Sequence, residues 1–122
     1  MESTIIKRIE LDNDQTLVIS DLSRKISEDA YVVIMTANIE IQIKRELFSF
    51  DPLSDFKFQD ILTTLGDNVI YEYKVERNFI MDNEKEGVFE KLVNDFWDNL
   101  GQYVSKPAFP GKAILKEYKD KK

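Results

Sequence analysis

The chain has neither cysteine nor histidine among its 122 residues. Without cysteine there are no disulfides, thiol nucleophiles or thiolate metal sites, and without histidine the commonest general base and the commonest transition-metal ligand are missing. Carboxylate chemistry and Mg²⁺ sites stay open, because 23 residues are Asp or Glu. The composition still removes most enzyme classes, and we expect a protein that is not an enzyme and has no cofactor or metal.

The sequence also lacks a long hydrophobic run, although 43% of its residues are hydrophobic. A membrane-spanning helix needs roughly 20 consecutive apolar residues, so we expect no membrane contact. The first eight residues are strand-like and lack the basic segment, apolar stretch and cleavage site of a secretory signal. We therefore expect a cytoplasmic protein.

Charge is unevenly distributed along this acidic chain, whose net charge is −6. Residues 112–122 hold five lysines against Glu117 and Asp120, a local charge of +3 that leaves −9 on the remainder. An acidic protein releases no counterions from nucleic acid, so we expect no nucleic-acid binding. Pro107 and Pro110 lead us to divide the chain into one α+β domain over residues 1–106 and a basic tail over 107–122, either flexible or partly helical.

A period of two in hydrophobicity is clearest over residues 30–44. Every second residue from Tyr31 to Ile43 is apolar, whereas the other parity is apolar at Val32 and Ile34 and polar from Glu40 onwards. This alternation predicts a long central strand of an antiparallel sheet.

The same alternation predicts three further strands. Residues 4–11 and 16–22 should form a hairpin around an Asp- and Asn-rich turn at residues 12–15, and residues 68–80 should form the fourth strand. Residues 22–29 are mostly polar, and we interpret them as a loop that leads into the long strand.

Two segments change to the period of an α-helix. Ser54 is suited to cap a short helix whose apolar residues end at Leu65, before Gly66. An apolar stripe from Phe89 to Tyr103 predicts a long helix over residues 84–104. The expected fold is therefore α+β: a four-stranded, mainly antiparallel sheet with one long C-terminal helix packed on a face and one short helix between strands three and four.

Two charged residues interrupt the apolar parity of their strands. Asp21 follows Leu17 and Ile19 in phase, and Arg77 falls between Val75 and Phe79. One hypothesis is a buried ion pair between them, a second is a polar or anionic ligand at the sheet edge, and a third is that both are simply solvated. In the second hypothesis, the ligand-binding residues are Asp21, Arg24, Tyr71, Tyr73 and Arg77.

Aromatic residues predict a contact surface for a protein. Phe48, Phe50 and Phe56 flank Pro52 in a segment that cannot all be interior, and Trp97 stands at the margin of the long helix's stripe. Two helices also cannot easily cover the second apolar face of the sheet. We expect a homodimer through that face or through a sheet edge, or binding to another protein.

The runs TLVISDLSRKI at residues 16–26 and YEYKVERNFI at 71–80 resemble a family of short bacterial proteins of unknown function. The resemblance implies a bacterial, cytosolic source and supplies no activity. The leading hypothesis is a small non-enzymatic interaction or regulatory module. A small-ligand-binding domain is the alternative, and a carboxylate-based enzyme is the third.

Overall fold

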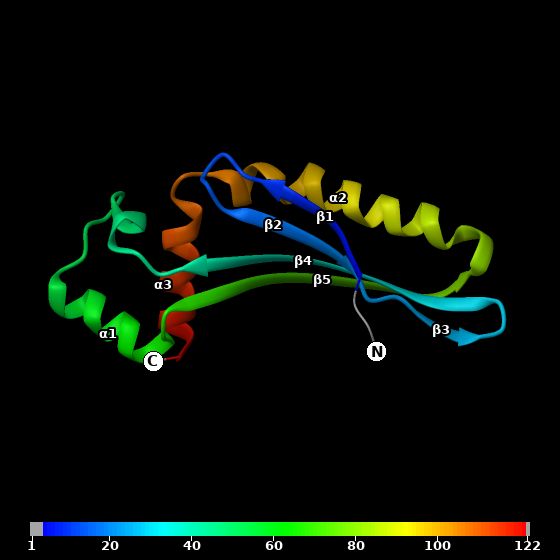
Figure 1. The fold of residues 1–122 in the computed structure, drawn as a ribbon, viewed down its shortest axis with the longest axis horizontal. Helices are drawn as coiled ribbons and strands as arrows, with labels where there is room; N and C mark the ends of the chain where they lie inside the picture. The colour runs from blue at the N-terminus through cyan, green and yellow to red at the C-terminus, as the bar shows by residue number, and fades with distance from the viewer. Residues whose placement is uncertain (1–3, 122) are drawn as a thin grey trace.

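The computed structural model describes residues 4–121, which form one antiparallel sheet and three α-helices (Figure 1). The α+β class and the antiparallel sheet are as predicted. The strands are β1 (Thr4–Glu10), β2 (Thr16–Asp21), β3 (Arg24–Ser27), β4 (Ala30–Gln42) and β5 (Asn68–Met81). The helices are α1 (Asp55–Leu65), α2 (Lys85–Ser105) and α3 (Phe109–Lys121), with short 3₁₀ turns η1 (Arg45–Phe48) and η2 (Asp82–Glu84).

β4 is the central strand of the sheet. β5 pairs with it along one side, while β2 and β3 pair with successive parts of the other side. β1 extends the sheet beyond β2. Because opposed residues of antiparallel strands share a face, the odd-numbered residues of β4 define one face and the even-numbered residues the other.

The odd-numbered face of β4 is covered by α2 (Figure 1). Val33, Met35 and Ile39 are fully buried there and belong to one hydrophobic core with Phe89 and Phe96 of α2. The stripe that predicted a helix over residues 84–104 is therefore the stripe that covers the sheet, and the helix bounds differ by one residue.

Local capping signals fix the ends of α1. The Oγ of Ser54 accepts a hydrogen bond of 3.1 Å from the backbone N of Lys57, and Gly66 ends the helix at a φ of 85°. A left-handed conformation at this position favours glycine, so both predicted caps are present.

The turn between β1 and β2 is tied to the end of α2. The Nδ2 of Asn13 donates to the carbonyl oxygens of Val104 at 2.8 Å and Lys106 at 2.9 Å, and its Oδ1 accepts from the N of Gln15 at 3.1 Å. Asp14 adopts a φ of 68°, which Asp tolerates better than most residues. The bond to Val104 satisfies a carbonyl group that the helix end leaves free, and both bonds hold the hairpin against the end of α2.

The sheet has five strands rather than the predicted four. Arg24–Ser27, predicted as a loop, forms β3 against the beginning of β4. All four of its residues are exposed, so no apolar alternation marks this strand in the sequence. Its formation depends on the backbone ladder with β4 rather than on burial of side chains.

The helix arrangement also differs from the prediction, because the residues expected to form a tail form α3. Phe109 and Ile114 of α3 are buried, and Tyr118 donates a hydrogen bond to Asp60 of α1. Pro110 lies in the first turn of α3, where a missing N–H is tolerated. Phe109 and Ile114 thus belong to the same hydrophobic core as the buried residues of α2.

Candidate interaction face

The even-numbered face of β4 carries a second, smaller group of apolar side chains. Val32 and Ile34 are each 5% exposed, yet they lie outside the hydrophobic core that α2 covers. Leu22 lies opposite Ile34 and Val18 lies opposite Asn38 on the same face, and both are half-buried. No helix among residues 4–121 packs over this group. We call this surface the open face, and it comprises Ile5, Arg8, Val18, Ser20, Leu22, Val32, Ile34, Thr36, Asn38, Glu72, Lys74 and Glu76.

The open face has charged margins on either side of its centre. Arg8, Val18, Asn38 and Glu72 lie opposite one another in one row across β1, β2, β4 and β5. In the adjacent rows, Thr36 lies between Ser20 and Lys74, and Ile34 lies between Leu22 and Glu76. The margin on β1 is therefore basic at Arg8, and the margin on β5 alternates between acidic and basic residues.

Two polar atoms near the centre of this face have no hydrogen-bond partner among the described residues. They are the Oγ1 of Thr36 and the Oδ1 of Asn38, and both are buried. Leaving a buried polar atom unpaired costs about 1–3 kcal/mol. Ser20 and Lys74 lie opposite Thr36, and Val18 and Glu72 lie opposite Asn38, yet neither oxygen is hydrogen-bonded to a described residue.

Asp21 and Arg77 share the odd-numbered face but lie on opposite sides of β4. Asp21 is opposite Met35 and Arg77 is opposite Val33, and within residues 4–121 no ion pair joins them. The Nη1 of Arg77 donates instead to the carbonyl oxygen of Glu76 at 2.9 Å. The strand order thus keeps the two charges apart.

The carboxylate of Asp21 stabilises the turn between β2 and β3. Its Oδ1 accepts a hydrogen bond of 2.8 Å from the backbone N of Ser23, and the Oγ of Ser23 accepts one of 2.9 Å from the N of Ile34. An Asp that bonds the backbone two residues later is a recurrent turn motif. The local role of Asp21 is therefore structural.

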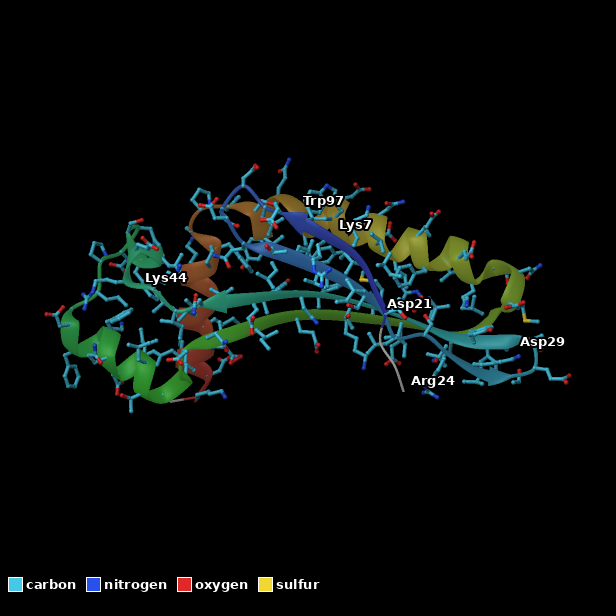
Figure 2. All side chains as sticks on the ribbon, in the orientation of Figure 1. Lys7, Asp21, Arg24, Asp29, Lys44 and Trp97 are labelled. Atoms are coloured by element: carbon cyan, nitrogen blue, oxygen red, sulfur yellow. The ribbon has the colours of Figure 1, made fainter. Side chains whose placement is uncertain are left out.

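The other residues predicted to bind a ligand do not converge on Asp21. Arg24 is paired with Val32, so it lies on the same side of the sheet as the open face, and Figure 2 shows its side chain projecting away from the sheet. Tyr71 packs edge-on against Phe109 of α3, with ring centroids 5.2 Å apart. Tyr73 packs against Phe96 of α2, with centroids 5.0 Å apart. Both tyrosines thus contribute to the contact between sheet and helices.

Tyr71 is a titratable residue whose environment alters its ionisation. Burial raises the pKa of its phenol above the ordinary value of 10.0, and the charges of Tyr103 and Tyr73 raise the pKa further. The phenol is therefore neutral at physiological pH, which suits a packing residue better than a general base.

The aromatic residues predicted to contact a partner occupy different parts of the structure. Phe48 is only 1% exposed and packs edge-on against Phe58, so it belongs to the core and not to a contact surface. Phe50 is exposed after η1, and Phe56 is 83% exposed on α1. Trp97 is 41% exposed on α2 (Figure 2), and its ring lies against Gly101.

Two shallow hollows adjoin these surfaces. One, of about 760 Å³, lies beside Trp97 and is lined by residues that include Asp12 and Lys106. The other, of about 630 Å³, continues the open face past Val18 towards Glu40. Within residues 4–121, no group of three or more acidic residues is placed to hold a metal ion, and no helix is long and apolar enough to cross a membrane.

Comparisons with protein-family models, with curated proteins and with solved structures give no match. The function of this chain is therefore argued from the placement of its residues. The apolar residues Val32 and Ile34 predicted a second apolar face of the sheet. Of the individual site residues predicted from the sequence, none belongs to the open face.

Proposed function

We propose that this chain is a non-enzymatic interaction module that binds another protein through its open face. The observation that carries the proposal is the accessible apolar group of Ile5, Val18 and Leu22, which lies outside the core on the same face as the buried Val32 and Ile34 and the unpaired oxygens of Thr36 and Asn38. Interface centres combine apolar area with a few polar atoms that are satisfied across the interface.

A protein partner suits this surface better than a small molecule does. Small-ligand sites are concave and enclose most of the ligand, whereas the open face is the outer side of a sheet. The ligand-binding alternative requires Arg24 to act with Asp21 and Arg77, but their side chains lie on opposite faces. The charged residues Arg8, Glu72 and Glu76 surround the apolar centre as a polar rim surrounds an interface core.

Lysine substitutions on the open face test the proposal. Val18→Lys and Leu22→Lys change half-buried side chains, and a lysine there can extend its ammonium group to water, so we expect both variants to fold. Phe56→Lys is the matched control, because it replaces an exposed hydrophobic residue on α1, away from the open face. Wild type and variants are immobilised and exposed to a lysate of the source cells, and retained proteins are quantified by mass spectrometry.

We expect a protein that wild type and Phe56→Lys retain equally and that both open-face variants retain roughly tenfold less, as for loss of an interface hot spot. Equal retention by all four proteins would contradict the proposal. Native mass spectrometry of the purified chain is the complementary measurement. A small molecule bound in stoichiometric amount would favour the ligand-binding alternative instead.

A further inference from the structure

β5 presents a long edge with no strand beside it in the described part of the chain. The strand has 14 residues and pairs only with β4. Exposed edges of this length invite pairing with another strand. This edge is bounded at both ends, because α3 lies beside residues 69–72 and a bulge at Phe79, with a φ of 55°, interrupts the strand near its other end.

The ladder with β4 shows which backbone groups of β5 point towards this edge. The N of Ile43 donates to the O of Asp67 at 2.8 Å, so these opposed residues form a hydrogen-bonded pair. Such pairs alternate with non-bonded pairs along an antiparallel ladder, so the odd-numbered residues up to Val75 bond to β4. The N–H and C=O groups of Glu72, Lys74 and Glu76 therefore point outwards, and the C=O of Glu76 accepts from the Nη1 of Arg77 at 2.9 Å with one lone pair left for a second donor.

The side chains of β5 fit a second copy of β5. A two-fold axis through Val75, perpendicular to the sheet, sets two such strands antiparallel with the same faces on the same side. This axis places Lys74 opposite Glu76 of the second copy at two symmetric positions. It also places Tyr73 of each copy opposite Arg77 of the other. Opposite charges and cation–aromatic pairs directly across a strand pair are stabilising.

The neighbouring symmetric registers fit less well. An axis through Lys74 sets that residue opposite itself and Glu72 opposite Glu76, and an axis through Glu76 also opposes like charges, which destabilise a strand pair. An axis through Tyr73 also sets Lys74 opposite Glu72 at two symmetric positions, but it leaves Glu76 opposite Ile70 and moves the pairing towards α3.

We infer that the chain forms a homodimer through the β5 edge, in the register centred on Val75. The two sheets become one continuous sheet with both open faces on one side.

Charge reversal tests both the dimer and its register. Lys74→Glu sets two pairs of carboxylates opposite each other, and Glu76→Lys sets two pairs of ammonium groups opposite each other. Within one chain, the Nζ of Lys74 and the Oε1 of Glu76 form an ion pair of 3.5 Å between side chains that are 48% and 47% exposed. An exposed pair contributes little to stability, so we expect both variants to fold. Sedimentation equilibrium at low salt should show each variant dimerising at least about tenfold more weakly than wild type.

Two rescue experiments make the charge test specific. Mixing the two single variants should produce a heterodimer, because one supplies carboxylates at both positions and the other supplies ammonium groups at both. The double variant K74E/E76K should dimerise as wild type does. Lys7→Glu is the matched control, since it makes the same charge change on β1, at the opposite edge of the sheet, and should leave the dimer intact.

A single cysteine gives an independent measure of the geometry. Val75 and its symmetry mate form a non-hydrogen-bonded pair, whose Cα atoms lie about 4.5 Å apart, within reach of a disulfide. Because the chain has no other cysteine, oxidised Val75→Cys should run as a cross-linked dimer, and Lys7→Cys on the opposite edge should stay a monomer under the same denaturing conditions.

A monomeric wild type would overturn the inference, and so would a dimer that neither charge reversal weakens. Weakening by Lys74→Glu alone, without an effect of Glu76→Lys, would overturn the register in favour of the axis at Tyr73. These results are independent of the proposed function, because Val18→Lys and Leu22→Lys do not alter the β5 edge.

Discussion

Thr36 combines a buried position with an unpaired hydroxyl. Thr36→Val removes that oxygen and keeps the branched shape of the side chain. We expect the free energy of unfolding of the isolated chain to rise by about 1 kcal/mol, because the unfolded state no longer gains by hydrating the hydroxyl. Urea denaturation measures the change. Thr16→Val is the control, since the Thr16 hydroxyl bonds to Glu10 at 3.0 Å and its loss should bring no gain. If Thr36→Val were less stable than wild type, the Thr36 hydroxyl could not be unpaired in the folded chain.

The raised pKa of Tyr71 predicts how the free energy of unfolding changes at alkaline pH. Its phenol has a pKa raised above 10.0 in the folded chain, by burial first and then by Tyr103 and Tyr73, so the folded state holds this proton more tightly than the unfolded state. The resulting stabilisation is complete below the unfolded pKa and is lost as pH rises through the folded pKa. Urea denaturation of wild type and Tyr71→Phe should therefore show wild type losing stability relative to the variant above pH 10.0. A constant difference across that pH would contradict the raised pKa.

Single residues were predictable from the sequence where their partners are close in the chain. Ser54 and Gly66 act within one helical turn, so their roles as caps followed from local pattern. The phase of Asp21 and Arg77 correctly gave their face, but phase carries no information on strand order, which separates them. Asn13 was missed because its carbonyl partner Val104 lies 91 residues away.

The helix α2 contains two glycines in different surroundings. A Cβ added at Gly87 would meet nothing within 4 Å, whereas one added at Gly101 would lie 2.8 Å from the Cδ2 of Trp97. Alanine is favoured over glycine in helices by up to about 1 kcal/mol, so Gly87→Ala should raise the free energy of unfolding by a similar amount. Gly101→Ala should lack that gain and shift the Trp97 emission to longer wavelength, because the indole ring must move outwards. Urea denaturation followed by fluorescence tests both, and equal stabilisation with unchanged emission would contradict the close contact.

The packing of α3 gives a second prediction for an element. A Cβ at Gly111 would overlap the carbonyl oxygen of Leu47 and lie 2.6 Å from the ring of Phe50. Backbone atoms cannot rotate away, so Gly111→Ala should lower the free energy of unfolding by about 1–3 kcal/mol. Lys112→Ala, at an exposed neighbouring position, should stay within about 0.5 kcal/mol of wild type. Thermal and urea denaturation measure both changes. If residues 107–122 were a tail, neither substitution would alter the free energy of unfolding.

Elements with a strong apolar period were predictable, and elements without one were not. The central strand, β5 and α2 bury a continuous stripe, and their positions in the sequence were predicted to within a few residues. β3 has no buried side chain, so only its ladder with β4 defines it. The lysines and prolines of α3 favoured a tail, but burial of Phe109 and Ile114 outweighs the cost of ordering its polar residues.

At the scale of the whole molecule, the sequence predicted the layers but not the strand order or the surfaces that this order leaves free. β4 accepts neighbours on both sides, with β2 and β3 on one side and β5, which follows β4 after η1 and α1, on the other. Among residues 4–121, this order leaves the edge of β5 without a neighbouring strand and places Thr36 and Asn38 on the face that α2 does not cover. Neither surface can be read from hydrophobic periodicity, which gives the face of each residue and not its neighbours across the sheet.

Self-association through β5 predicts that thermal stability depends on protein concentration. Only folded chains can pair along this edge, so mass action should raise the melting temperature of wild type as its concentration increases through the dissociation constant. Lys74→Glu should lack this dependence over the same range, and K74E/E76K should recover it. Added salt should reduce the dependence in wild type, because it screens the pairs between Lys74 and Glu76. Differential scanning calorimetry measures all three proteins, and a wild-type melting temperature that is independent of concentration would show that the β5 edge contributes no pairing to the native state.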